Sequence, residues 1–271
     1  MTKWRFLNTG FNNGAFNMAV DEAIMHFVAQ GSAPPTLRFY GWKPPAISLG
    51  FFQKVEREID LAACEQLGIS VVRRSTGGRA ILHENELTYS ILLGENYPGL
   101  PPSISESYKL LSSGLLAGFI LLGVKAELAP ANKVKPANAS SPACFDALST
   151  YEISVNGKKI AGSAQIRKGG ALLQHGSIIN DLDADKFFAC LAFPDEPTRE
   201  KAKKNFLEKA TCIKNETGNM MEWERLCTAF YQGFVQGLNI TLEPGQLSKA
   251  ELSLAGELVQ KYRSADWTHL R

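Results

Sequence analysis

The chain has five cysteines, and Cys144 is the one that stands at the end of a long loop of small residues and prolines, which spans Ala129–Ala143. Loops of this length inside a compact domain are usually functional or disordered. A loop cysteine is more often exposed and reactive than one on a periodic apolar face, so Cys144 is a candidate nucleophile. The alternative is an incidental thiol. The other four cysteines serve as a comparison. Cys64, Cys190 and Cys227 lie in helical patterns and are expected to be packed, whereas Cys212 has no motif around it.

Two lysines, Lys158 and Lys159, follow the pair Asn156-Gly157, which is a strong signal for a two-residue hairpin. Side chains alternate along a strand, so the two lysines face opposite sides. A lysine that points into a tight pocket is desolvated and can act as a base. Such a pocket could be lined by the small residues that follow, Gly162, Ser163 and Ala164. The alternative is that both lysines lie in solvent beside the turn.

A second small-residue segment contains two arginines, two glycines and a third arginine: Arg73, Arg74, Ser75, Thr76, Gly77, Gly78 and Arg79. Glycines between strands let the backbone approach a ligand closely and leave N–H groups free to donate. The spacing is neither that of a Walker loop nor GxGxxG. The alternative is a glycine turn with solvated arginines.

Two histidines, His83 and His175, lie near these segments and could shape a pocket or sit in a hydrogen-bonded core. The sequence offers neither of them an obvious acid partner. We therefore predict no histidine-based catalytic triad.

Composition limits the possible partners. The 271 residues include 29 basic and 27 acidic side chains, a net charge of +2, which gives no reason to expect a nucleic acid or a membrane surface as partner. Five cysteines without CxxC spacing and four histidines argue against disulfides and a zinc site, and favour a reducing compartment. The first residues lack the apolar core of a signal peptide. We expect a cytoplasmic monomer without a metal.

Periodicity and turn residues predict the elements that must position these side chains. We expect strands at 4–7, 36–40, 46–49, 69–73, 79–83, 87–93, 151–155, 159–166 and 171–179. Helices are expected at 15–30, after Asp60 as far as Gly68, and at about 105–122, with mostly helix from Asp185 onward. This mixed order predicts the α+β class. We expect one catalytic domain over 1–245 and a C-terminal helical extension of it over 246–271.

Several segments together resemble the superfamily of lipoate-protein ligases and octanoyltransferases, which is related to biotin protein ligases. The resemblance spans nearly the whole chain. It is carried by NMAVDEA, RFYGWKPPAISLGFFQ, RRSTGGRAILH, ACFDALSTYEI, GKKIAGSAQ and LLQHGSI. It is greatest to the octanoyl-acyl-carrier-protein:protein N-octanoyltransferases, and it implies an α+β fold built on a mixed sheet.

The resemblance also implies an activity: transfer of an octanoyl group from octanoyl-acyl carrier protein to a lysine of glycine cleavage H protein or another lipoyl domain. It implies that Cys144 carries the acyl thioester and that Lys159 is the base, while Arg73 through Arg79 and His83 line the acyl pocket. In the classical octanoyltransferases the cysteine follows the lysine, whereas here it precedes it. The donor thioester is already activated, so no cofactor or ATP is required. Backbone N–H groups at Gly162–Ala164 or Gly77-Gly78 could stabilise the oxyanion.

Three other functions remain open at this point. An ATP-dependent lipoate-protein ligase would share the arginine–glycine loop and the lysine but would need no cysteine. An octanoyl amidotransferase would move the group from H protein to E2 domains, again through a cysteine. A non-catalytic protein that binds carrier domains would form no covalent acyl adduct.

Overall fold

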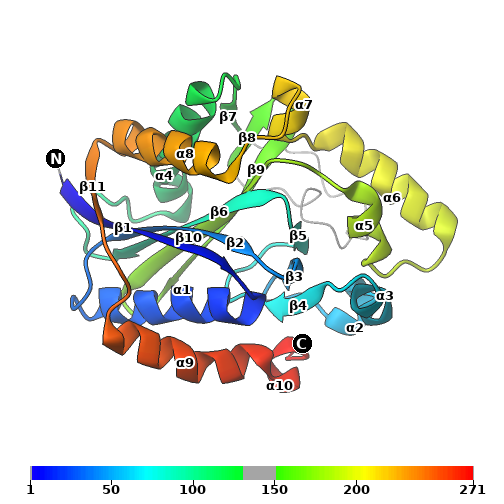
Figure 1. Cartoon of the computed structure of the whole chain (residues 1–271), viewed down its shortest axis with the longest axis horizontal. Coiled ribbons are helices and arrows are strands. Elements are labelled where there is room, and N and C mark those ends of the chain that lie inside the picture. The colour runs from blue at the N-terminus through cyan, green and yellow to red at the C-terminus, as the bar shows by residue number, and fades with distance from the viewer. Residues whose placement is uncertain (1, 131–150, 271) are drawn as a thin grey trace.

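The computed structural model describes residues 2–130 and 151–270, and within them an eight-stranded mixed sheet forms the centre of the fold (Figure 1). The strand order is β11-β1-β2-β6-β10-β9-β8-β7. The pairs β1–β11 and β1–β2 are parallel, and the other neighbours are antiparallel. The strands are β1 (Thr2–Asn12), β2 (Thr36–Trp42), β6 (Glu86–Gly94), β7 (Glu127–Pro130), β8 (Tyr151–Val155), β9 (Lys158–Lys168), β10 (Ala171–Ile179) and β11 (Ile240–Pro244).

Helices cover both faces of this sheet. On one face α1 (Gly14–Ala29) packs against the strands, and α9 (Lys249–Arg263) packs on α1; on the other lie α4 (Ile104–Leu121) and α8 (Trp223–Leu238) (Figure 1). The central strands are buried on both sides, so even the polar residues within them, such as Thr88 and Ser90 of β6, are buried. Asn13 caps the start of α1 by accepting a hydrogen bond from the N–H of Phe16.

Glycines let α4 and α8 approach each other closely. A Cβ atom added to Gly233 would lie 2.4 Å from the backbone nitrogen of Gly118 and 2.7 Å from the carbonyl oxygen of Gly114. A Cβ atom on Gly118 or Gly114 would in turn meet the rings of Phe230 or Phe234. These glycines therefore set the distance between the two helices that cover one face of the sheet.

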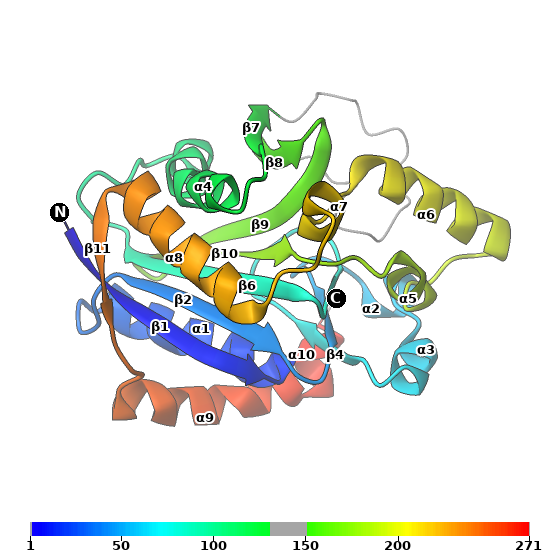
Figure 2. The same cartoon turned by 45° about the horizontal axis from the view of Figure 1, so that its top comes forward.

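A smaller, three-stranded sheet with the order β4-β3-β5 stands beside the large one (Figure 1), and Figure 2 shows its strand β4 next to α3. It comprises β3 (Ala46–Leu49), β4 (Ser70–Arg73) and β5 (Ile81–His83), with β4 parallel and β5 antiparallel to β3. Around it are α2 (Val55–Glu58), α3 (Leu61–Gln66), α5 (Ala184–Ala189) and α6 (Glu196–Lys209), followed by α7 (Ile213–Thr217). Its own apolar cluster joins Ile47 and Leu49 to Phe187, Phe188 and Phe206.

Most predicted elements are present, and β10 has the predicted bounds. The hairpin at Asn156-Gly157 is present, with positive φ at both residues. Cys64, Cys190 and Cys227 are buried as predicted, and Cys212 is buried too. The prediction of a mostly helical C-terminal part missed β11, which pairs with β1. Among the described residues, no helix is both long and apolar enough to span a bilayer.

Candidate active site

A cavity lies between the small sheet and strands β9 and β10 of the large sheet. Six of the predicted site residues line it: Arg74, Gly78, His83, Gly162, Ser163 and Ala164. Trp42, Ser48 and His175 also line it, and most of its surface is apolar. A neighbouring cavity between Ile81 and Phe206 is lined by none of these six residues. The first cavity is therefore the candidate active site.

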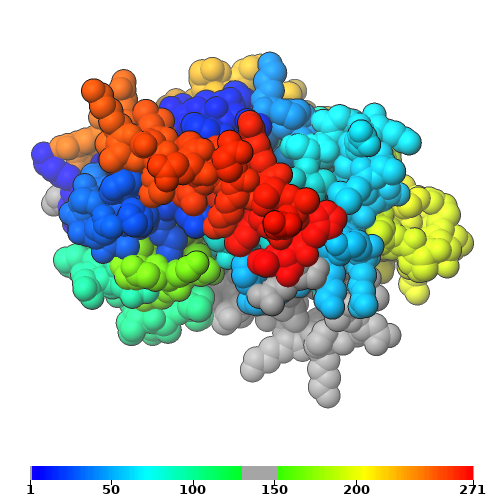
Figure 3. All heavy atoms as spheres, turned by 90° about the horizontal axis from the view of Figure 1, so that it is seen from below, coloured from blue at the N-terminus to red at the C-terminus, as the bar shows by residue number. Residues whose placement is uncertain are grey.

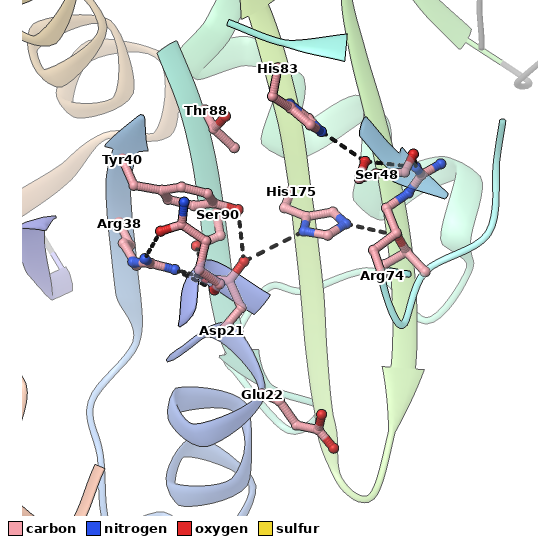
Figure 4. A network of polar contacts seen from close by, with 12 residues as sticks. Asp21, Glu22, Arg38, Tyr40, Ser48, Arg74, His83, Thr88, Ser90 and His175 are labelled. Atoms are coloured by element: carbon pink, nitrogen blue, oxygen red, sulfur yellow. Dashed lines mark hydrogen bonds and ion pairs between the residues drawn. The ribbon is translucent and has the colours of Figure 1, made fainter. Parts of the chain in front are cut away.

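A buried ion pair lies behind one wall of this cavity (Figure 4). Asp21 of α1 pairs with Arg38 of β2 at 2.6 Å, and both side chains are almost fully buried. The hydroxyls of Tyr40 and Ser90 also donate to Asp21, at 3.0 and 2.8 Å. Burial opposes ionisation of Asp21, but Arg38 and His175 outweigh it and hold its pKa below the usual value. Asp21 is therefore an anion surrounded by donors.

His175 of β10 connects this ion pair to the arginine–glycine loop. Its Nδ1 lies 3.5 Å from a carboxylate oxygen of Asp21, and its Nε2 lies 2.7 Å from the hydroxyl of Thr76. Burial lowers the pKa of His175, although the Asp21 carboxylate acts in the opposite direction. The imidazole is thus neutral near pH 7. With Nδ1–H directed at Asp21, its Nε2 accepts the hydroxyl hydrogen of Thr76 and fixes the loop at that point.

A second chain of the same kind runs from Glu86 through His83 to Ser48. His83 Nδ1 lies 2.7 Å from a carboxylate oxygen of Glu86, and His83 Nε2 lies 2.7 Å from the hydroxyl of Ser48. The hydroxyls of Thr88 and Ser177 donate to the same Glu86 carboxylate. The sequence offered neither histidine an obvious acid partner, but the structure gives each of them a carboxylate, Glu86 for His83 and Asp21 for His175. The carboxylates come from other positions of the fold, and only the pair His83 and Glu86, three residues apart, could have been suspected from the sequence.

The two arginines that open the loop have different environments. The Arg74 guanidinium donates to the carbonyls of Ser48, Gly77 and Arg79, which curls the loop around it at the cavity wall. Arg73 does not line the cavity: it is fully buried on the other side of the loop. Its hydrogen bonds run to backbone carbonyls of residues 50–53 and of the C-terminal residues 267–268. Ser75, Thr76, Gly77 and Arg79 are likewise absent from the cavity lining.

Lys159 is buried at 7% exposure, and its Nζ donates to a carboxylate oxygen of Glu152 at 3.0 Å. A Cβ atom on Gly162 would lie 3.7 Å from its Cε, so the lysine stem lies just behind the cavity wall that Gly162 forms. Its neighbour Lys158 is exposed. The predicted partner, Cys144, lies outside the described residues.

Among residues 2–130 and 151–270, no group of histidine, cysteine and carboxylate side chains has the arrangement of a metal site. Sequence reasoning missed Asp21, Glu86 and Ser48 as members of the site. Asp21 lies within the NMAVDEA segment, where an acid among the apolar positions of a helix was the available signal.

Known proteins resemble this chain both in sequence and in fold. The family model of the lipoyl protein ligase A/B catalytic domain matches residues 13–235. A protein of Geobacillus kaustophilus named octanoyltransferase LipM is 46% identical, covering 99% of this chain and 98% of its own length. A protein of the same name from Kyrpidia tusciae is 45% identical, with 99% of both chains covered. The solved structure of a bipartite lipoate protein ligase from Thermoplasma acidophilum aligns with a TM-score of 0.82 and 26% identity, covering 100% of this chain and 98% of that one.

Proposed function

The chain belongs to the lipoyl protein ligase A/B catalytic domain family and is an acyltransferase, and from this premise we propose its donor, acceptor and intermediate. It transfers an octanoyl group from octanoyl-acyl carrier protein to a lysine of glycine cleavage H protein or another lipoyl domain. The acyl group passes through a thioester on Cys144. The observation that carries this proposal is the burial of Lys159 directly behind Gly162, at the wall of the apolar cavity.

The first half-reaction forms the acyl-enzyme. Lys159, in its neutral form, takes the proton of the Cys144 thiol, and the thiolate attacks the carbonyl carbon of the donor thioester. The carrier's sulfur leaves as a thiolate and receives that proton. One thioester bond forms and one breaks, so the step is nearly neutral in free energy and needs no ATP. Glu152, 3.0 Å from Lys159 Nζ, orients the amine.

The second half-reaction forms the product amide. The neutral amine of the acceptor lysine attacks the Cys144 thioester, the sulfur leaves, and the proton lost by the nitrogen ends on that sulfur. An amide is more stable than a thioester, which drives the step forward. The octanoyl chain occupies the cavity, where Gly162 leaves space for it. The hydroxyls of Ser48 and Thr76 are hydrogen-bonded to the imidazoles of His83 and His175, so these groups do not need a polar partner from the acyl chain.

The test follows the acyl group by intact-protein mass spectrometry. The wild-type chain, incubated with octanoyl-acyl carrier protein without ATP, is expected to gain one octanoyl group and to lose it when H protein is added. Cys144→Ala should form no adduct and transfer nothing, whereas Cys212→Ser, a substitution at a buried thiol, should still be acylated. Full transfer by Cys144→Ala would reject the thioester intermediate.

An ATP-dependent ligase is the second candidate, because the Thermoplasma acidophilum relative of known structure is described as a lipoate protein ligase. The same incubation distinguishes the two. A ligase would modify H protein from free octanoate and ATP, and it would do so equally well in Cys144→Ala. The proposed transferase would not modify H protein from free octanoate and ATP, either as wild type or as Cys144→Ala.

A further inference from the structure

The C-terminal end of the chain lies against the outer side of the arginine–glycine loop. Figure 3 shows the last helix, in red, beside the segment that follows residue 50, in blue and cyan. We propose that residues Ser264–His269, which contain α10 (Ala265–Thr268), are a positioning element that holds the loop Arg73–Arg79 in place at the cavity. The kinetic part of this inference rests on the proposed function; the structural part does not.

Arg73 makes the central contact. Its guanidinium donates to the carbonyl oxygens of Trp267 at 3.0 Å and of Thr268 at 2.6 Å. The same group donates to the carbonyls of Gly50, Phe51 and Gln53 at 3.1, 3.0 and 2.7 Å. A buried guanidinium needs its N–H groups satisfied, and its planar fork fixes the directions of the acceptors. Arg73 thereby ties the end of the chain to the segment that precedes the loop.

Trp267 makes the reciprocal contact. Its indole N–H donates to the carbonyl oxygen of Arg73 at 2.9 Å, so the side chain and the backbone of Arg73 are both bound to the same turn. The indole is held in turn by α9: the Lys261 ammonium lies 4.2 Å from its ring centre, and the Tyr262 ring packs edge-on at 5.7 Å. Lys261 and Tyr262 also bind the Glu22 carboxylate of α1, each at 2.6 Å. Trp267 is therefore supported by an ordered helix pair.

The inner side of the loop is held independently of this contact. Thr76 is bonded to His175 at 2.7 Å, and its carbonyl accepts from the N–H of Phe51 at 2.8 Å. The loop is thus fastened to the cavity wall from within and to the chain terminus from without. Gly78, two residues beyond Thr76 in the same loop, lines the cavity. Loss of the outer attachment should let this segment move while the sheets remain intact.

The experiment uses Trp267→Ala, Trp267→Phe and the control Leu270→Ala, whose side chain in the same terminal segment is exposed at 44%. Hydrogen exchange by mass spectrometry is read on peptides covering residues 73–79, and kcat and KM are measured with octanoyl-acyl carrier protein. Trp267→Phe keeps the ring but removes the N–H donor, which guards against loss of folding in the alanine variant. Thermal unfolding is recorded to select a temperature well below the transition of every variant.

We expect exchange in residues 73–79 to rise in both Trp267 variants, and kcat/KM to fall on the order of tenfold, since small displacements of positioning groups have effects of this size or larger. Exchange in β6 and β10 should equal that of wild type in both Trp267 variants. Leu270→Ala should match wild type in loop exchange and in kcat/KM. Loop exchange equal to wild type in both Trp267 variants would overturn the inference, as would faster exchange with unchanged kcat/KM. An inactive wild-type protein would count against the proposed function alone, because exchange does not depend on turnover.

Discussion

Asp21 and Glu22 are consecutive in α1, and their carboxylates bind partners on two different faces of this helix. Asp21 faces the sheet, where it lies 2.6 Å from Arg38. Glu22 faces α9, where it lies 2.6 Å from Lys261. Adjacent positions on a helix point about 100° apart, so one turn of α1 can serve two partners. Through His175 on one side and Trp267 on the other, these two residues connect to the inner and outer attachments of the arginine–glycine loop.

Replacing Asp21 tests the buried half of this arrangement. Asp21→Asn leaves the Arg38 guanidinium buried without its counter-charge, and breaking a buried pair in this way typically costs about 3–5 kcal/mol. We expect the free energy of unfolding in urea to fall by about that amount. The control is Asp185→Asn, which removes an exposed partner of Lys203 and should change stability far less, because solvent screens an exposed pair. Equal losses in the two variants would show that the Asp21 pair contributes no more than a surface contact.

His175 should make stability depend on pH. Burial lowers its pKa in the folded protein, so between that value and the usual value of about 6.5 the unfolded chain binds the extra proton. The free energy of unfolding is therefore highest, as far as His175 is concerned, above about pH 6.5, and it decreases as the pH falls towards the pKa of His175 in the folded protein. One such group contributes a slope of at most about 1.4 kcal/mol per pH unit. The pKa of Asp21 is also lowered in the folded protein, so protonation of this carboxylate decreases the free energy of unfolding further at more acidic pH.

The measurement is urea unfolding between pH 7.5 and 5 for wild type and His175→Gln. The variant keeps polar atoms at this position but does not titrate, so its stability should vary less over this range. The two curves should converge at the acidic end. If both proteins lose stability in parallel from pH 7.5 to 5, another group is responsible for the slope.

Sequence reasoning succeeded where one residue and its neighbours decide the structure. The Asn156-Gly157 turn, the helix that begins after Asp60 and the strand at 171–179 all follow from local preferences, and the structure contains them. The polar partners of the site could not be found in this way, because Asp21 and His175 are far apart in the chain and meet only when α1 packs on β10. Arg73 was misjudged for the same reason: its acceptors at residues 267–268 come from the other end of the chain.

Lys159 and Lys158 form a matched pair, because they are adjacent in β9 but one is buried and the other exposed. We expect Lys159→Ala to slow formation of the acyl-enzyme by about 10²-fold or more, the usual effect of losing a positioned base. Lys158→Ala should be acylated at the wild-type rate. Mass spectrometry of quenched time points gives the rates, and circular dichroism checks that both variants are folded. An unfolded Lys159→Ala would assign this lysine to the structure instead of the chemistry.

The glycines between α4 and α8 offer a test of packing that is independent of the active site. In Gly233→Ala the new methyl group would lie 2.4 Å from the backbone nitrogen of Gly118, and a backbone atom cannot move aside without shifting its helix. We expect a loss of about 1–3 kcal/mol, the usual cost of overpacking, measured by urea unfolding. Gly256 lies in the middle of α9 with nothing within 4 Å of an added Cβ atom. Gly256→Ala should therefore raise stability by about 0.5–1 kcal/mol, because alanine is the better helix former. If Gly233→Ala also raises stability, close packing does not explain the glycine at 233.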